Sequence, residues 1–252
     1  MTRTAIVSAL RDELAVVLKR LPDEHKSEVA GREFWRGHWH GFEVVATLSG
    51  IGKVAAATTA TLLIERFKVD HVLFTGVAGA LAQGVRVGDL VLADELLQHD
   101  IDAAPLFPRY EVPGTGLSRL PTDLALSATL RRAAQATLAD LPRWLEPAVR
   151  QEFGLHSPSL HQGLLISGDR FISTSAECKA LRQALPDALA VEMEGAAFAQ
   201  VCRDFGVPLA VLRTISDNAD DAAHLDFPRF LRDVASHYSA SVLDHFFWDL
   251  VI

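Results

Sequence analysis

Three acidic side chains from distant parts of the chain each come shortly after an apolar run with the pattern of a buried strand. They are Glu13, Glu194 and Asp217. Because ligands collect where the carboxyl ends of strands meet the following loops in α/β sheets, we expect these carboxylates to lie close together. Cleavage of a glycosidic bond needs one acid for the leaving group and one base for water, and a third carboxylate could hold sugar hydroxyls.

The acids and two glycine-containing turns also have plainer interpretations. An acidic residue after a strand can cap the next helix and complement its dipole. The turn Gly76–Gly79 lacks the full GxGxxG pattern and the P-loop lysine, so it indicates a tight turn rather than a dinucleotide or triphosphate site. The turn Ser49–Lys53 could let the backbone approach a ligand, although close packing is the commoner reason for such glycines.

The histidines do not indicate metal or covalent chemistry. His38 and His40 share a face if their segment is a strand, but no carboxylate or third histidine lies in register, which favours a surface strand over a metal site. His99 and Asp100 could form an oriented imidazole, yet no Ser or Cys nucleophile motif accompanies them. We therefore interpret this pair as structural.

The elements that must position the carboxylates follow from hydrophobic periodicity. The predicted strands cover residues 4–10, 44–48, 71–75, 90–93, 163–167, 188–191 and 209–214, and the predicted helices cover 54–67, 124–138, 196–205 and the tail from Phe227. Strands that alternate with helices predict an α/β sandwich on a largely parallel or mixed sheet. The stretch 140–161 has no clear periodicity, and we expect it to be a surface excursion.

The composition indicates one acidic domain. The chain has 252 residues, of which 49% are hydrophobic, so we expect a single domain over residues 1–252. The net charge of -8 has the wrong sign for a protein that binds nucleic acid or an acidic membrane. We expect no signal peptide or membrane span, because no apolar run has the length or the flanks for either. Cys178 and Cys202 are far apart, which predicts reduced cytoplasmic thiols.

Several segments together resemble the methylthioadenosine/S-adenosylhomocysteine nucleosidases, within the wider nucleoside phosphorylase family. The matching segments are AIVSALRDE from Ala5, SGIGKVAAA from Ser49, TGVAGAL from Thr75, VGDLVLADELLQHD from Val87, SGDRFI from Ser167, VEMEGAA from Val191 and RTISDNAD from Arg213. The resemblance implies a three-layer α/β/α sandwich with a mixed central sheet, a homodimer, and no metal or organic cofactor. It also implies a hydrolase that cleaves the N-glycosidic bond of 5′-modified adenine nucleosides.

The same resemblance implies catalytic roles. Asp217 matches the general acid that protonates N7 of adenine as the bond to ribose stretches, and Ser216 would help to fix its carboxyl group. Glu13 matches the residue that activates the attacking water, and Glu194 matches the one that binds the ribose hydroxyls. Arg213 would assist on the water and sugar side.

For the substrate, the resemblance implies that Phe171 and Ile172 hold the base and that Met193 packs beneath the sugar and base. The other residues expected to line the binding site are Glu192, Val77, Ala78 and Gly79, with Leu10, Ile51 and Phe227 against the 5′ substituent. A partner subunit completes that pocket in the family, and Ala103, Phe107 or Tyr110 could serve here.

Two departures from the family pattern bear on the reaction. Val77 stands where the nucleosidases carry a serine, and the phosphorylases use an arginine before that turn and a serine within it to hold phosphate. With Phe74 and Val77 at those places, water is favoured as the acceptor. The segment 104–116 differs from the usual 5′ loop, which leaves methylthioadenosine, S-adenosylhomocysteine, 5′-deoxyadenosine and futalosine as candidate substrates.

Arg109 bears on that choice, because an arginine directed into the pocket would favour a polar or anionic substituent. The alternatives to the nucleosidase are a phosphate-dependent purine nucleoside phosphorylase, a futalosine hydrolase and a non-catalytic nucleoside-binding protein.

Overall fold

A mixed sheet forms the centre of the computed structural model, which describes residues 2–21, 23–219 and 227–251. Its strands run in the order β2-β3-β4-β1-β5-β11-β6-β10-β9-β7-β8. Their bounds are β1 Arg3–Ser8, β2 His25–Val29, β3 Arg32–Trp39, β4 Phe42–Leu48, β5 His71–Phe74, β6 Val77–Ala80, β7 Leu90–Gln98, β8 Leu120–Pro121, β9 Leu160–Ser167, β10 Ala188–Glu192 and β11 Leu209–Asp217. The strands from β4 through β1 and β5 to β11 are parallel.

A ring of strands closes one half of the sheet. β11 pairs with β6 in parallel and also with β7 in antiparallel orientation. Because β6, β10, β9 and β7 are successive neighbours, the second pairing closes β11, β6, β10, β9 and β7 on one another. The long strand β11 therefore belongs both to the open parallel half and to the ring.

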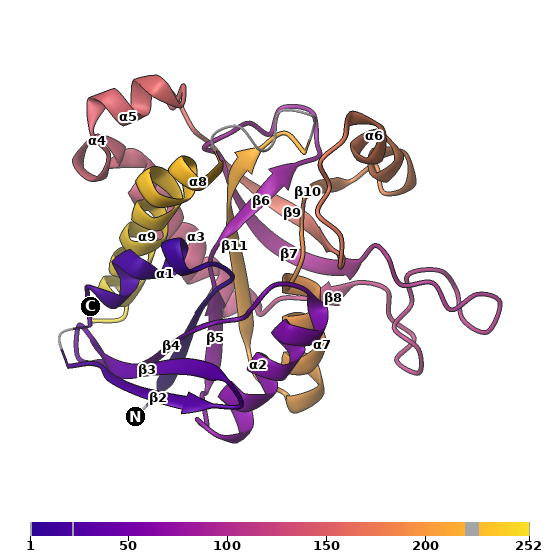
Figure 1. The fold of residues 1–252 in the computed structure, drawn as a ribbon, viewed down its shortest axis with the longest axis horizontal. Coiled ribbons are helices and arrows are strands. Elements are labelled where there is room, and N and C mark those ends of the chain that lie inside the picture. The colour runs from indigo at the N-terminus through magenta and orange to yellow at the C-terminus, as the bar shows by residue number, and fades with distance from the viewer. Residues whose placement is uncertain (1, 22, 220–226, 252) are drawn as a thin grey trace.

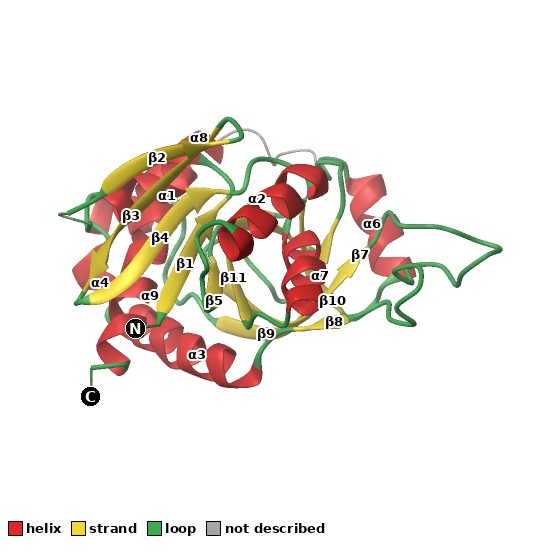
Figure 2. Cartoon of the chain, turned by 90° about the horizontal axis from the view of Figure 1, so that it is seen from below, coloured by secondary structure: helices red, strands yellow, loops and turns green. Residues whose placement is uncertain are grey.

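Helices cover both faces of the sheet, as Figures 1 and 2 show. On one face α2 packs against α7, and on the other α9 packs against α1 and α3. The helix bounds are α1 Arg11–Leu18, α2 Lys53–Glu65, α3 Leu124–Ala139, α4 Leu141–Trp144, α5 Pro147–Glu152, α6 Ser175–Ala184, α7 Gly195–Phe205, α8 Phe227–Phe230, the π-helical turn η1 Leu231–Ala235 and α9 Ser236–Asp249. Both sheet faces are therefore buried, which explains the continuous apolar runs of the central strands.

Local sequence explains where several helices begin and end. The side chains of Asp123 and Thr174 accept hydrogen bonds from backbone N–H groups in the first turns of α3 and α6. Helix α7 ends at Gly206, whose φ of 68° is the left-handed conformation that favours glycine. Among the described helices, none is long and apolar enough to cross a bilayer.

The structure confirms the predicted three-layer α/β/α sandwich and every predicted strand and helix, with different bounds. One interpretation was wrong, because residues Val77–Ala80 form strand β6 rather than a tight turn. Most of the stretch 140–161 lies at the surface, as predicted, although it contains α4, α5 and the start of β9 and buries Leu141, Leu145 and Leu155. Asp220, the last residue of the RTISDNAD segment, lies outside the described residues.

Candidate active site

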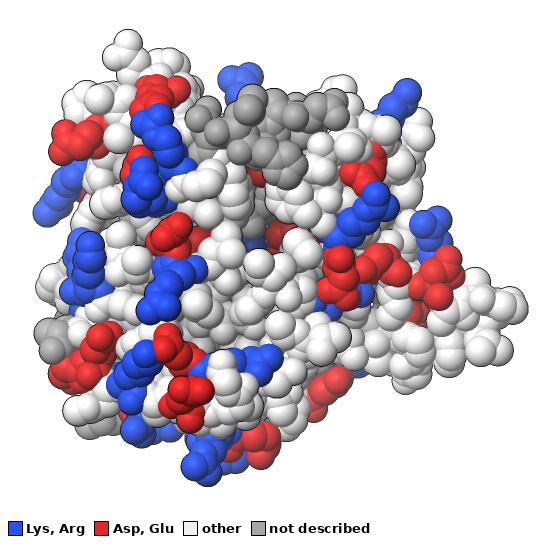
Figure 3. All heavy atoms as spheres, in the orientation of Figure 1, with Lys and Arg blue, Asp and Glu red and all other residues white. Residues whose placement is uncertain are grey.

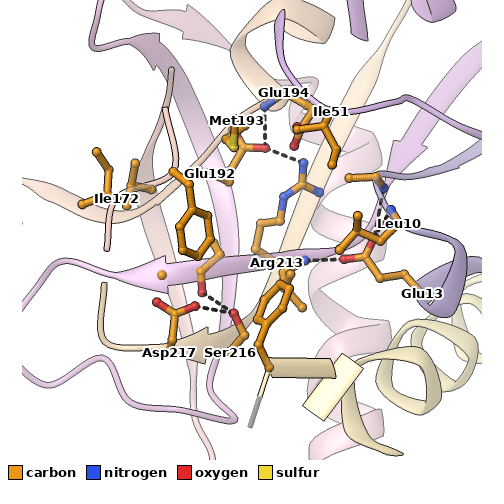
Figure 4. Close-up of a pocket in the computed structure, with 18 of the residues that line it drawn as sticks. Leu10, Glu13, Ile51, Ile172, Glu192, Met193, Glu194, Arg213, Ser216 and Asp217 are labelled. Atoms are coloured by element: carbon orange, nitrogen blue, oxygen red, sulfur yellow. Dashed lines mark hydrogen bonds and ion pairs between the residues drawn. The ribbon is translucent and has the colours of Figure 1, made fainter. Parts of the chain in front are cut away.

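A pocket lies where the open half of the sheet meets the ring, and it encloses about 780 Å³ of empty space if the solvent at its open side is included. It appears as a hollow near the middle of the face in Figure 3, with acidic atoms inside it. The pocket contains all three carboxylates that the sequence analysis singled out, Glu13, Glu194 and Asp217. Figure 4 shows them on three sides of the hollow, with Arg213 between them.

The directions of the strands explain only in part why the three carboxylates lie in one pocket. The strands before Glu13 and Asp217, β1 and β11, run parallel to β5 and end at one edge, as expected. Strand β10, which precedes Glu194, runs antiparallel to β6 and so approaches from the other direction. Because β6 is only four residues long, its pairing of Gly79 with Val191 still brings the end of β10 to the pocket.

Glu13 lies in the first turn of α1 and is fully buried. Its Oε2 accepts hydrogen bonds from the N–H groups of Ala9 (2.9 Å) and Leu10 (2.8 Å), and its Oε1 accepts one from the N–H of Val77 (3.0 Å). Burial raises the pKa of Glu13 to about 7, although these bonds and the charge of Arg213 act in the opposite direction. A carboxyl group with this pKa is suited to proton transfer near neutral pH.

Glu192 and Arg213 form a buried ion pair at the base of the pocket. The Arg213 Nη2 atom lies 2.8 Å from Glu192 Oε2, and both side chains are almost fully buried. The guanidinium group also stacks 4.0 Å above the ring of Phe74. Glu192 further accepts hydrogen bonds from the N–H groups of Glu194 and Gly195 and from the Ser167 hydroxyl, so its carboxylate fixes the start of α7.

Glu194 projects into the pocket from the N-terminus of α7. Its Oε1 accepts a hydrogen bond of 2.8 Å from the N–H of Gly52, in the loop before α2. Burial, and then the negative charge of Glu192, raise the pKa of Glu194 above its ordinary value. The glycine-rich turn Ser49–Lys53 therefore brings backbone against the site.

Asp217 occupies the end of β11, and neighbouring groups fix its carboxyl group. The Ser216 hydroxyl donates to Asp217 Oδ2 at 2.7 Å, and the N–H of Ala219 donates to Oδ1 at 2.8 Å. A Cβ atom on Gly79 would lie only 2.9 Å from Asp217 Oδ1. This position therefore needs glycine because the carboxyl group packs directly against the β6 backbone.

Apolar side chains form the remaining walls. The rings of Phe171 and Phe227 meet edge to face, with centroids 6.3 Å apart. The other predicted residues that line the pocket are Leu10, Ile51, Val77, Ala78, Gly79, Ile172, Glu192, Met193, Arg213 and Ser216. The lining residues that the sequence analysis did not assign to the site are Ala9, Gly76, Arg170 and Val191. They neighbour assigned residues, so extending each motif by one residue could have found them.

The single chain does not bring Phe107 or Tyr110 to its own pocket. They lie in the segment between β7 and β8, which projects from the body in Figures 1 and 2. Arg109 of that segment stacks on the Tyr110 ring at 4.7 Å and is also outside the pocket. Their expected contribution from a partner subunit stays a prediction.

The histidines are held by carboxylates. His38, in β3, lies 2.6 Å from Asp23, and His40, in the following turn, lies 2.8 Å from Asp244. Within the described ranges, no group of three or more His, Cys, Asp and Glu side chains is arranged to hold a metal ion.

Comparisons with known proteins agree over nearly the whole chain. The sequence profile of the phosphorylase superfamily matches residues 3–247. A 5'-methylthioadenosine/S-adenosylhomocysteine nucleosidase of Geobacillus thermodenitrificans is 37% identical over 242 residues, which cover 96% of this chain and 94% of the relative.

Solved structures give the same result. A Neisseria meningitidis nucleosidase of that name, in complex with methylthio-immucillin-A, has a TM-score of 0.86 and 30% identity, covering 99% of this chain and 100% of its own. A futalosine hydrolase of Helicobacter pylori has a TM-score of 0.84 and 33% identity, covering 98% of both chains.

Proposed function

Because the chain belongs to the phosphorylase superfamily, and within it to the methylthioadenosine/S-adenosylhomocysteine nucleosidases, we propose that it hydrolyses the N-glycosidic bond of 5′-modified adenine nucleosides. The products are adenine and the free sugar. The observation that carries this proposal is the meeting of Glu13, Glu194 and Asp217 in one pocket. A ribose that becomes cation-like in the transition state is stabilised by such a surplus of carboxylates.

The three carboxylates divide the reaction between them. Asp217, oriented by Ser216, gives its proton to N7 of adenine so that the base leaves as a neutral molecule. Glu13 accepts a proton from the attacking water, as its raised pKa allows. Glu194 holds the ribose hydroxyls, and the backbone N–H of Gly52 holds Glu194.

The apolar walls bind the two ends of the nucleoside. Phe171 and Ile172 take the base, by ring stacking and backbone hydrogen bonds, and Met193 packs beneath the sugar. Leu10, Ile51 and Phe227 surround the 5′ substituent, and their apolar character supports an alkylthio group.

The charges in the pocket support water as the acceptor. Phosphate is an anion, and the pocket presents it with four carboxyl groups. Of the two arginines among the described lining residues, Arg213 is paired with Glu192 and Arg170 is paired with Glu177. Phe74, at the place where phosphorylases carry an arginine, lies beneath the Arg213 guanidinium group and offers phosphate no hydrogen-bond donor from its side chain.

The test is incubation of the purified protein with methylthioadenosine, with and without phosphate, followed by identification of both products. We expect adenine and free methylthioribose at a rate independent of phosphate. A phosphate requirement with sugar 1-phosphate as product would instead establish a phosphorylase. Tight nucleoside binding without any adenine release would establish a non-catalytic binder.

Futalosine is the second candidate substrate, favoured by the 33% identity to the Helicobacter pylori futalosine hydrolase. Arg109 lies outside the pocket of its own chain, in the segment expected to reach the pocket of a partner subunit. We rank methylthioadenosine first because Leu10, Ile51 and Phe227 give the pocket of the single chain an apolar wall. Values of kcat/KM for methylthioadenosine, S-adenosylhomocysteine, 5′-deoxyadenosine and futalosine, measured in parallel, decide the order.

We further propose that the whole chain acts as one domain and assembles as a homodimer. The family profile spans residues 3–247, which supports a single domain. The resemblance to the nucleosidases implies the homodimer, in which the projecting segment between β7 and β8 would pack against the second copy. Light scattering coupled to gel filtration tests the dimer.

The expected setting is the cytoplasm, with a role in methionine salvage and nucleoside catabolism. Cys178 and Cys202 are both buried free thiols, which supports a reducing compartment. Small molecules are the expected partners rather than nucleic acid or membrane, and the mixture of both charge signs over the face in Figure 3 supports this expectation.

A further inference from the structure

Two motifs from the sequence, the Ser49–Lys53 turn and the His99–Asp100 pair, meet beside the pocket. The Lys53 Nζ atom lies 2.6 Å from Asp100 Oδ1, and both side chains are less than one third exposed. The other oxygen, Asp100 Oδ2, accepts a hydrogen bond of 2.8 Å from the N–H of Asp169. Asp169 Oδ1 in turn accepts one of 2.6 Å from the N–H of Lys53.

These three contacts form a closed ring of Lys53, Asp100 and Asp169, which we name the clasp. It joins the beginning of α2, the end of β7 and the loop after β9. Each contact involves a charged group, and such hydrogen bonds are stronger than neutral ones.

Each side of the clasp adjoins a part of the pocket. On one side Gly52, the neighbour of Lys53, donates its N–H to Glu194. On the other side Asp169 lies two residues before Phe171 and three before Ile172, which line the pocket. The clasp therefore fixes the separation between the proposed sugar ligand and the proposed base-binding residues.

The surrounding packing shows that the clasp is built into the fold. A Cβ atom on Gly52 would lie 2.9 Å from Asp169 Oδ1, so the two loops approach as closely as a glycine allows. Gly168 packs against the His99 ring, where a Cβ atom would lie 2.3 Å from Nε2. Lys53 Nζ also donates to Gln98, whose amide donates to Gln200 in α7.

We propose that Lys53, Asp100 and Asp169 are positioning residues. They hold the base-binding loop at a fixed distance from Glu194, so that the base and the ribose of the nucleoside are bound at the same time. This role rests on the proposed function. None of the three side chains lines the pocket, so they act through the loops and not on the substrate.

The first test compares Lys53→Met with Lys68→Met. Lys68 lies just beyond the C-terminal end of the same helix, α2, and forms an exposed ion pair with Glu65, so its variant controls for the loss of a lysine beside this helix. We expect Lys53→Met to raise KM for methylthioadenosine about 10-fold or more with a smaller change in kcat, because the loops bind both the ground state and the transition state. Lys53→Arg, which keeps the charge, should restore most of the affinity.

The second test is independent of activity. Hydrogen exchange of peptides that cover residues 49–53 and 167–174 should become faster in Asp100→Asn and in Lys53→Met, and should stay unchanged in Lys68→Met. If wild-type protein releases no adenine, the proposed function fails while this measurement still decides on the clasp. Unchanged exchange in both clasp variants, or equal KM values for Lys53→Met and Lys68→Met, would overturn the proposal.

Discussion

At the scale of single residues, the geometry of Glu13 suits both interpretations of an acid, the helix cap and the proposed catalytic base. Its carboxylate accepts a hydrogen bond from the backbone N–H of Leu10 at the start of α1, as the carboxylate of a helix-capping acid does. The same carboxylate reaches across to Val77 and faces the pocket. Capping therefore fixes the proposed base in place.

The pH dependence of activity should report this base. Glu13 must be ionised to accept a proton from water, and its pKa is raised to about 7. We expect kcat/KM for methylthioadenosine to rise with pH through about pH 7 and to lose about tenfold for each pH unit below that. A profile from pH 5 to 9 measures this limb, and a flat profile across pH 6 to 8 would remove Glu13 from the role of base.

Asp217→Asn should separate binding from catalysis. The amide keeps the shape of the carboxyl group but cannot supply the proton for N7, and general acid catalysis is typically worth about 10² to 10⁴ in rate. We expect kcat to fall by this factor while calorimetry shows nucleoside binding largely intact. Asp204→Asn, at an exposed ion pair with Arg203, is the control. A variant of Asp217 that keeps most of its activity contradicts the assignment.

Residue types and motif order predicted nearly all of the pocket, because the polar groups follow strands whose apolar runs are visible in the sequence. The role of Glu192 in fixing the start of α7 was not predictable, because two of its four partners, Ser167 and Arg213, lie far from it in the sequence. Phe107 and Tyr110 were assigned by resemblance alone, and one chain cannot bring them to its own site.

At the scale of elements, the start of α7 depends on one buried carboxylate. Glu192 neutralises the charge of Arg213 and accepts hydrogen bonds from the backbone N–H groups of Glu194 and Gly195. These N–H groups lie at the N-terminal end of the helix, where the helix dipole favours negative charge. The helix N-terminus and the ion pair thus stabilise each other.

Glu192→Gln should therefore destabilise the fold. The variant leaves Arg213 buried without a counter-ion, and breaking a buried pair typically costs about 3 to 5 kcal/mol of unfolding free energy. Urea denaturation measures this. The half-exposed pair of Arg119 and Asp187 provides the comparison, and Asp187→Asn should change the unfolding free energy by about 1 kcal/mol or less. Equal effects of the two variants would contradict this account.

Helices and strands with a clear hydrophobic periodicity were predictable from the sequence. The other elements form because of tertiary contacts, which the local sequence does not show. The strands β2 and β3 carry alternating polar residues and form an edge hairpin, so no continuous apolar run marks them. Strand β6 consists of VAGA, a short segment in which three of the four residues are small, and only pairing with β10 and β11 makes it a strand. Helices α4 and α5 are one turn or little more, too short for a period to appear.

At the scale of the whole molecule, no local segment contains the site. The proposed acid, base and sugar ligand come from β11, α1 and the start of α7. These segments come together because β11 pairs with strands of both the parallel half and the ring. The pocket therefore forms only when both halves of the sheet have formed.

The burial of Glu13 also has a thermodynamic consequence for folding. The unfolded chain loses this proton near the ordinary pKa of 4.5, whereas the folded protein retains it up to about pH 7. Because the folded pKa is the higher one, the contribution of Glu13 to stability is fully present below pH 4.5, falls as the pH rises, and is lost above about pH 7. The change amounts to about 3 kcal/mol in total.

A variant that cannot ionise should lack this dependence. We expect the unfolding free energy of wild type, relative to Glu13→Gln, to fall by about 2.5 kcal/mol between pH 5 and pH 8 in urea denaturation. Parallel curves for the two proteins would contradict the raised pKa. The protein thus gives up folding stability over the same pH range in which its proposed base ionises, and substrate bound to the ionised form would restore part of that loss by mass action.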